Sequence, residues 1–231
     1  MAAREQVLNP VSTSTAPDFY PVVKDLPRVV VAPGVTLELL VLAADGDHCA
    51  GVDLASGALV RAWSPVPAPE PLEPYDVVAV TLDVDVDAVP DPAEPEALVL
   101  AGPPEPRRRI TGRRAEKLLK PLLHPKGRPL LGISAPAVPF WERIPDHPSI
   151  ALVEPEGQIS LWRDGSYLAC RFGWQGHERE LPCMDRRVAR LMDRAGMTRM
   201  GGSKGDRLVV SLTPPIDGRC HKVVEAILPR P

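Results

Sequence analysis

The sequence predicts an all-β protein with minor helix, in which two small barrels are joined by a proline-rich, partly helical bridge. Hydrophobic residues make up 44% of the 231 positions and charged residues 25%, so the chain has enough apolar surface to build cores. Its 29 prolines disfavour long helices, because proline breaks helix interiors. Short β-branched runs separated by turn residues recur in both halves, which is typical of many short strands.

The first module is expected over residues 28–106, after a flexible tail at 1–27. Apolar runs at 28–33, 35–44, 48–54 and 58–63 are separated by Pro-Gly, Asp-Gly-Asp and Ala-Ser-Gly, which are turn signals. Residues 64–75 are rich in proline and predict an extended connector. A further strand is expected over 76–89, and a last short run at 97–101 ends the module.

The bridge is expected over residues 107–147. It opens with an arginine run, and residues 113–119 have helical character that Pro121 interrupts. The prolines that follow predict irregular structure, with Phe140 and Trp141 as its buried anchors.

The second module is expected over residues 148–231. Runs at 149–155, 157–163, 166–174 and 177–182 indicate a meander of hairpins, and a helix follows over 185–195 with Gly196 as its stop. Strands at 206–212 and 219–228 complete the pattern. This is the element count of a five-stranded OB-like barrel with a helix inserted between its strands, and the first module has a similar count.

Charge is distributed unevenly between the halves. Residues 1–106 carry 4 Lys and Arg against 17 Asp and Glu, a net charge of −13, while residues 107–231 carry 23 against 13, a net charge of +10. This asymmetry fits either a polyanionic partner for the basic half or two halves that neutralise each other.

Two groups of residues are candidates for binding nucleic acid. The second module interleaves aromatic rings with arginines, and strand alternation places Tyr167 and Arg171 on one face and Phe172 in the core. The candidates on this module are Arg163, Tyr167, Arg171 and Trp174. The alternative is that Trp162 and Trp174 are core residues, because aromatics are scarce in this chain.

The second group is the basic run of the bridge, which would neutralise phosphates without reading sequence. Its members are Arg107, Arg108, Arg109, Arg113, Arg114 and Lys117. The alternative is a solvated linker whose charges pair with the acidic first module.

Other chemistry finds little support in the sequence. The four cysteines lie far apart, which favours reduced, buried thiols over a zinc site. Asp83, Asp85 and Asp87 fall on one face of the expected strand, and exposed alternation explains them without a metal. We expect no cofactor, no metal and no catalytic set, and neither an export signal nor a membrane-spanning run is apparent, which predicts a cytoplasmic protein.

Short motifs resemble the bacterial dual OB-containing domain family, whose members are described as nucleic-acid binders. The segment 48–52, HCAGV, followed by 60–65, VRAWSP, is similar to the family's opening. Segments 149–157 and 171–177 look like its central strand and hairpin, and 210–218 with 221–227 look like its ending. The resemblance implies two OB folds and supplies no catalytic residues. It departs from the family at Ala43-Ala44-Asp45 and His48, where members carry basic residues.

The leading hypothesis is therefore a non-catalytic protein that binds single-stranded DNA or RNA through the second barrel and the basic bridge. The alternative is an interaction adaptor in a bacterial complex, possibly a defence system, whose acidic first module docks a partner protein. An enzyme acting on nucleic acid is a third hypothesis.

Overall fold

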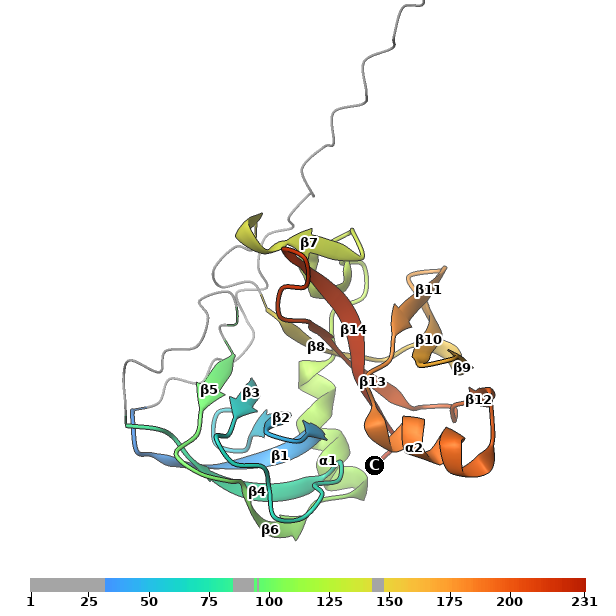
Figure 1. Cartoon of the computed structure of the whole chain (residues 1–231). Helices are drawn as coiled ribbons and strands as arrows, with labels where there is room; N and C mark the ends of the chain where they lie inside the picture. Colours follow the sequence, from blue (N-terminus) through green and yellow to red (C-terminus); the bar gives the residue numbers. More distant parts are fainter. Residues whose placement is uncertain (1–31, 85–93, 95, 143–147) are drawn as a thin grey trace, which may run out of the picture.

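A computed structural model describes residues 32–84, 94, 96–142 and 148–231, which form a mostly β structure with two short helices. The expected tail at 1–27, and Asp85 and Asp87, lie outside the described residues. The strands curl into two barrel-like units, one built from β1 to β6 and one from β8 to β14 (Figure 1). No helix in the described part of the chain is long and apolar enough to cross a membrane.

In the first unit the strand pairing returns to its starting point. Its strands are β1 (Thr36–Asp45), β2 (His48–Asp53), β3 (Leu59–Trp63), β4 (Asp76–Thr81), β5 (Ala97–Val99) and β6 (Glu105–Arg109). β1 pairs antiparallel with β2 and β4, β2 with β3, and β3 runs parallel to β5. Leu82, just after β4, bridges Leu100, just after β5, which completes the ring. We call this unit the first barrel.

The first residues of the expected bridge, 107–109, form part of a strand. The arginine run lies in β6, which pairs with the free side of β4 and so belongs to the first barrel. Helix α1 (Gly112–Leu119) follows, and a 3-10 turn (Lys120–Leu122) that contains Pro121 ends it, as the sequence predicted. After a second 3-10 turn (Leu130–Gly132) comes the short strand β7 (Ala137–Pro139).

The prediction that Phe140 and Trp141 are buried anchors is wrong. Both lie in a 3-10 turn (Phe140–Glu142) directly after β7, and their side chains are 37% and 75% exposed. β7 pairs only with the start of β14, at the edge of its sheet, so the turn that leaves it projects outward.

The second unit repeats the pairing order of the first. Its elements are β8 (Ile150–Val153), β9 (Glu156–Asp164), β10 (Tyr167–Trp174), β11 (His177–Pro182), α2 (Arg186–Ala195), β12 (Arg199–Gly201), β13 (Arg207–Leu212) and β14 (Arg219–Leu228). β8 and β9 together play the part of β1: β9 pairs with β10 and β12, and β8 with β13. β10 pairs with β11 and β13 with β14, and Cys183 bridges Val224 in parallel. We call this unit the second barrel.

Helix α2 lies between the third and fourth strands of the second barrel, and its bounds agree with the helix predicted over 185–195. The side chain of Asp185 accepts hydrogen bonds from the backbone N–H groups of Arg187 and Val188, which caps the first turn. Gly196 ends the helix with a φ of 62°, a left-handed conformation that glycine adopts without strain.

One glycine in each barrel allows its second strand to approach a bulge in its first. A Cβ on Gly51 would lie 2.6 Å from the backbone oxygen of Leu40, and a Cβ on Gly173 would lie 2.6 Å from that of Glu156. The pairing register shifts close to both glycines. Bulges of this kind bend the strand, and here they curl both sheets.

Three apolar clusters account for the packing. One fills the first barrel, with Leu39, Val60 and Val80 among its members, and another fills the second barrel around Phe172. The third lies between the barrels, where Leu119 of α1 packs with residues of β1, β8, β13 and β14. Residues 39–43 of β1 are buried on both faces of the strand, and this part of its sequence is a continuous apolar run.

Charged residues join the two halves at this junction. Buried Arg61 of β3 donates to the hydroxyl of Ser149 and to the backbone oxygen of Leu212, and also pairs with Glu94 at 3.1 Å. Two ion pairs cross the junction, Arg186–Asp45 at 2.8 Å and Arg187–Glu73 at 3.6 Å, and the His48 ring lies 3.2 Å from a carboxylate oxygen of Glu225. These contacts fit the alternative that the halves neutralise each other.

Candidate nucleic-acid interface

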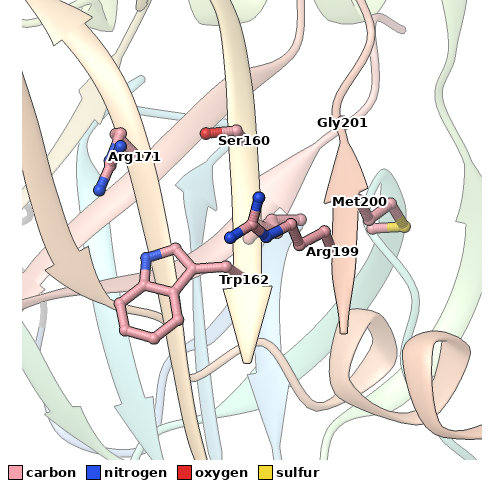
Figure 2. A pocket seen from close by; sticks show the side chains of 7 residues that line it. Ser160, Trp162, Arg171, Arg199, Met200 and Gly201 are labelled. Carbon is pink, nitrogen blue, oxygen red and sulfur yellow. The ribbon is translucent and has the colours of Figure 1, made fainter. Parts of the chain in front are cut away.

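The outer face of β9, β10 and β12 carries the site. Residues directly opposite each other on paired strands project to the same face. Ala169, Trp162 and Arg199 form one such row, and Arg171, Ser160 and Gly201 form the next. The small residues leave a hollow of about 580 Å³, which we call the Trp162 face. Figure 2 shows Arg171 on one side of Trp162 and Arg199 reaching across β9 from the other.

Trp162 is half-buried and held in one orientation. Its indole meets the ring of Tyr167 edge to face, with centroids 5.7 Å apart. Its Nε1–H donates to Glu180 Oε2 at 3.2 Å, and the same oxygen accepts two hydrogen bonds from Arg171 at 2.9 and 3.1 Å. The bonds from Arg171, and then the one from Trp162, lower the pKa of Glu180, so this carboxylate stays ionised and keeps both groups in place.

The two guanidinium groups beside Trp162 differ in their partners. Arg171 is engaged by Glu180 and lies 3.4 Å from a carboxylate oxygen of Glu178. Arg199 is exposed, and its guanidinium makes no hydrogen bond or ion pair with the residues that the structure describes. Arg199 is therefore the side chain on this face most available to an anionic ligand.

The predicted residues of the second barrel divide between this face and other places. Tyr167 and Arg171 are exposed on it and Phe172 is buried, as alternation predicted. Arg163 instead forms an ion pair with Asp193 of α2. Trp174 is only 1% exposed and belongs to the core, because the alternation that turns Phe172 inward also turns Trp174 inward. Trp174 is therefore not a surface for stacking.

The predicted basic run lies on the first barrel, and its arginines are paired. Arg107 contacts Glu105 at 2.9 Å, Arg108 contacts Glu38 at 2.5 Å, and Arg109 lies 3.6 Å from Asp76. This arrangement matches the alternative in which the run pairs with the acidic module.

The remaining basic residues, Arg113, Arg114 and Lys117, are exposed on α1. β6 lies at the edge of the first barrel, away from β9 and β10 (Figure 1). The two candidate groups therefore do not merge into one channel.

Sequence reasoning missed Arg199, Ser160 and Gly201. The segment 199–201 contains one glycine and no β-branched residue, so nothing in its composition marks it as a strand. It becomes one because it pairs with β9, and that pairing is a property of the barrel. Arg199 can therefore be identified from the strand order, in which the segment after α2 lies beside β9, the first strand of this sheet.

The described residues form neither a metal site nor a reactive thiol site. No group of three His, Cys, Asp or Glu side chains in residues 32–84, 94, 96–142 and 148–231 is placed to hold a metal ion. The four cysteines are buried, reduced thiols, as the sequence predicted. Burial raises the pKa of Cys49 to about 12, which leaves its thiol protonated and unreactive.

Comparisons with known proteins add no identity to this geometry. No protein family, no curated protein and no solved structure matches the chain.

Proposed function

We propose that the protein binds single-stranded nucleic acid, DNA or RNA, without catalysing a reaction on it, and that the Trp162 face is the binding surface. The observation that carries the proposal is the half-buried indole of Trp162, held by Glu180 and Tyr167 between Arg171 and Arg199. Stacking on aromatic rings beside guanidinium groups is how single strands are bound without a sequence requirement.

The strand order supports this proposal. Around each unit, the neighbouring strands are the first, second, third, fifth and fourth, and the fourth pairs again with the first. This is the strand order of a five-stranded OB barrel. OB folds bind oligonucleotides on the face of their second and third strands. The Trp162 face includes the second strand of the second barrel, β10, and adjoins it on β9. The resemblance to the dual OB-containing domain family leads to the same proposal, with a bacterial origin.

The chemistry of the face fits binding better than catalysis. A base stacks on Trp162, Arg199 contacts a phosphate, and Arg171 exchanges Glu178 for a second phosphate. The hollow is lined by one hydroxyl, that of Ser160, and by no histidine. The Glu180 carboxylate on the same face is already engaged by Arg171 and Trp162.

The test is fluorescence anisotropy with a labelled oligothymidine and an oligouridine, using matched variants. Trp162→Ala should weaken binding about 5- to 150-fold, since stacking contributes ~1–3 kcal/mol per base. Its control is Trp141→Ala, because Trp141 is 75% exposed but lies on the turn after β7. Arg199→Met should flatten the plot of log affinity against log salt by about 0.7, the value of one phosphate contact on a single strand.

The control for Arg199 is Arg190→Met on α2, whose guanidinium donates only to the backbone oxygen of Arg186. If the wild-type protein binds neither oligonucleotide at low salt, or if Trp141→Ala is as damaging as Trp162→Ala, the Trp162 face is not a nucleic-acid site. The adaptor hypothesis would then lead. Against it at present, four carboxylates of the acidic half, those of Glu38, Asp45, Glu73 and Asp76, already pair within the molecule.

A further inference from the structure

A second hollow lies at the seam of the second barrel. β11 pairs within its sheet only with β10, and the parallel bridge of Cys183 with Val224 joins its end to β14. Beyond that bridge the two strands separate, and residues 129–136 cover the gap. The cavity has a volume of about 500 Å³, large enough for a small metabolite, and we call it the seam pocket.

Lys222 of β14 is a buried cation in the wall of the seam pocket. The residue is 5% exposed, and its ammonium donates to the backbone oxygen of Ile133. No carboxylate of the described residues pairs with it. Burial, and to a smaller degree the charge of nearby Arg179, lower the pKa of Lys222 to about 8. An ammonium in this position destabilises the fold unless an anion joins it.

Two further donors line the same pocket without partners. Arg179 of β11 is close enough to Lys222 to affect its charge, yet it makes no ion pair or hydrogen bond with the described residues. The indole nitrogen of Trp174 is buried and has no hydrogen-bond partner among the described residues. Glu178 and Glu180 also line the pocket, but both contact Arg171 on the outer face of β10.

We propose that the seam pocket binds the dianionic phosphate of a phosphate monoester, held by Lys222, Arg179 and the indole N–H of Trp174. Two positive charges match a phosphate monoester, which carries a charge of about −1.5 to −2 near neutral pH. A carboxylate would balance only one of them. Leu130, Ile133 and Ala135 supply apolar walls for the organic part of the ligand. This inference does not depend on the proposed function, because the three donors of the seam pocket are different side chains from Trp162, Arg171 and Arg199.

The experiment follows the indole N–H signals of the full chain by ¹H–¹⁵N correlation spectroscopy while inorganic phosphate is added at constant ionic strength. The chain has four tryptophans, and the signals of Trp63 and Trp141, which lie away from both proposed sites, are internal controls. The Trp174 signal should shift in a saturable way, and acetate should not reproduce the shift. Lys222→Met and Arg179→Met should each weaken phosphate binding at least about tenfold, because each removes a charge-assisted hydrogen bond.

Arg190→Met on α2 is the control variant and should bind phosphate as the wild type does. Lys222→Met should still fold, because it replaces a buried charge by an apolar side chain of similar length. If the other three indole signals of Lys222→Met keep their wild-type positions, the variant is folded. If phosphate leaves the Trp174 signal unmoved, or if the shift persists in Lys222→Met, the proposal is overturned.

Two further arms identify the source of the phosphate. Adenosine monophosphate tests a free phosphate ester, and an oligothymidine with or without a 5′-phosphate tests the end of a strand. A Trp174 shift with the monophosphate assigns a small-molecule ligand, whereas a shift that needs the 5′-phosphorylated strand assigns the end of a nucleic acid. Since the oligothymidine without 5′-phosphate can still bind the Trp162 face, failure of the seam pocket and failure of the proposed function remain distinguishable.

Discussion

The two barrels share one strand order but use the outer faces of their first strands in opposite ways. In the first barrel, Leu40 and Leu42 project outward from β1 and are completely buried against α1 and the second barrel. In the second barrel the corresponding strand, β9, projects Ser160 and Trp162 to the solvent side. The same surface is therefore a docking face in one barrel and the proposed ligand face in the other.

The difference follows from side-chain chemistry and not from backbone topology. In both strands, the residues of the outer face alternate with residues that point into the barrel. Both strands also bend at a bulge opposite a glycine. Apolar side chains must be covered, so the first barrel recruits α1. A ring surrounded by small and charged residues stays open, because its polar neighbours are already solvated. A repeated fold can thus separate assembly from binding.

The two barrels also differ in the segment that connects their third and fourth strands. The first barrel uses the proline-rich segment 64–75, which cannot form a helix, whereas the second uses α2. α2 contributes Met192 to the core and leaves Leu191 52% exposed. α2 thus packs mainly on its own barrel, whereas α1 packs between the two.

The largest effect is expected from a break in the docking layer. Leu119 of α1 is completely buried between the barrels, so Leu119→Ala should lower the free energy of unfolding by about 2–5 kcal/mol. Urea denaturation measures this loss. Leu191→Ala on α2 is the matched control and should change the free energy by no more than about 0.5 kcal/mol. Equal losses in the two variants would mean that α1 is not the element that unites the barrels.

Local signals in the sequence account for the parts of this comparison that were predicted. Asp185 and Gly196 mark the ends of α2, because capping and a left-handed C-terminus depend only on neighbouring residues. The strand formed by Arg107–Arg109 was not predicted, since arginines have no strong strand preference. It forms because β4 offers a free edge and because Glu38 and Asp76 accept the charges, and these partners are distant in sequence.

The candidate site shows the same limit. Strand alternation correctly predicts that Tyr167 and Arg171 are exposed, and when it is extended to residue 174 it also predicts that Trp174 is buried. No local pattern distinguishes Trp162, which lies half-exposed on a strand of the same type. Arg199 reaches the face only through the pairing of β12 with β9, so the strand order must be known before the site can be assembled.

A smaller effect should appear at the charged contact between the barrels when the pH falls. Burial lowers the pKa of His48 below its usual 6.5, although Glu225 opposes this. The unfolded chain then takes up the proton first, so the contribution of His48 to stability is complete above pH 6.5 and is lost as the pH falls toward the lowered value. Burial lowers the pKa of His124 in the same direction.

Urea midpoints measured between about pH 8 and about pH 5.5 should therefore decrease, and His48→Gln should make the decrease shallower. Glu96 acts in the opposite direction, because burial raises its pKa and its protonation favours the folded state as the pH falls. A His48→Gln protein with the wild-type pH dependence would show that this contact does not couple the barrels to pH.

The smallest expected effect sharpens the description of the ligand face. Glu178 lies 3.4 Å from Arg171 and is largely exposed, so it competes with a phosphate for that guanidinium. Glu178→Gln should strengthen oligonucleotide binding about two- to fivefold, since an exposed ion pair contributes ~0.2–1 kcal/mol. Glu70→Gln, in the proline-rich segment of the first barrel, makes the same charge change away from the face and should leave the anisotropy titration unchanged. The gain should shrink as salt rises, because screening weakens both the competing ion pair and the phosphate contact. A loss of affinity in Glu178→Gln would mean that Arg171 positions Trp162 through Glu180 and does not itself contact phosphate.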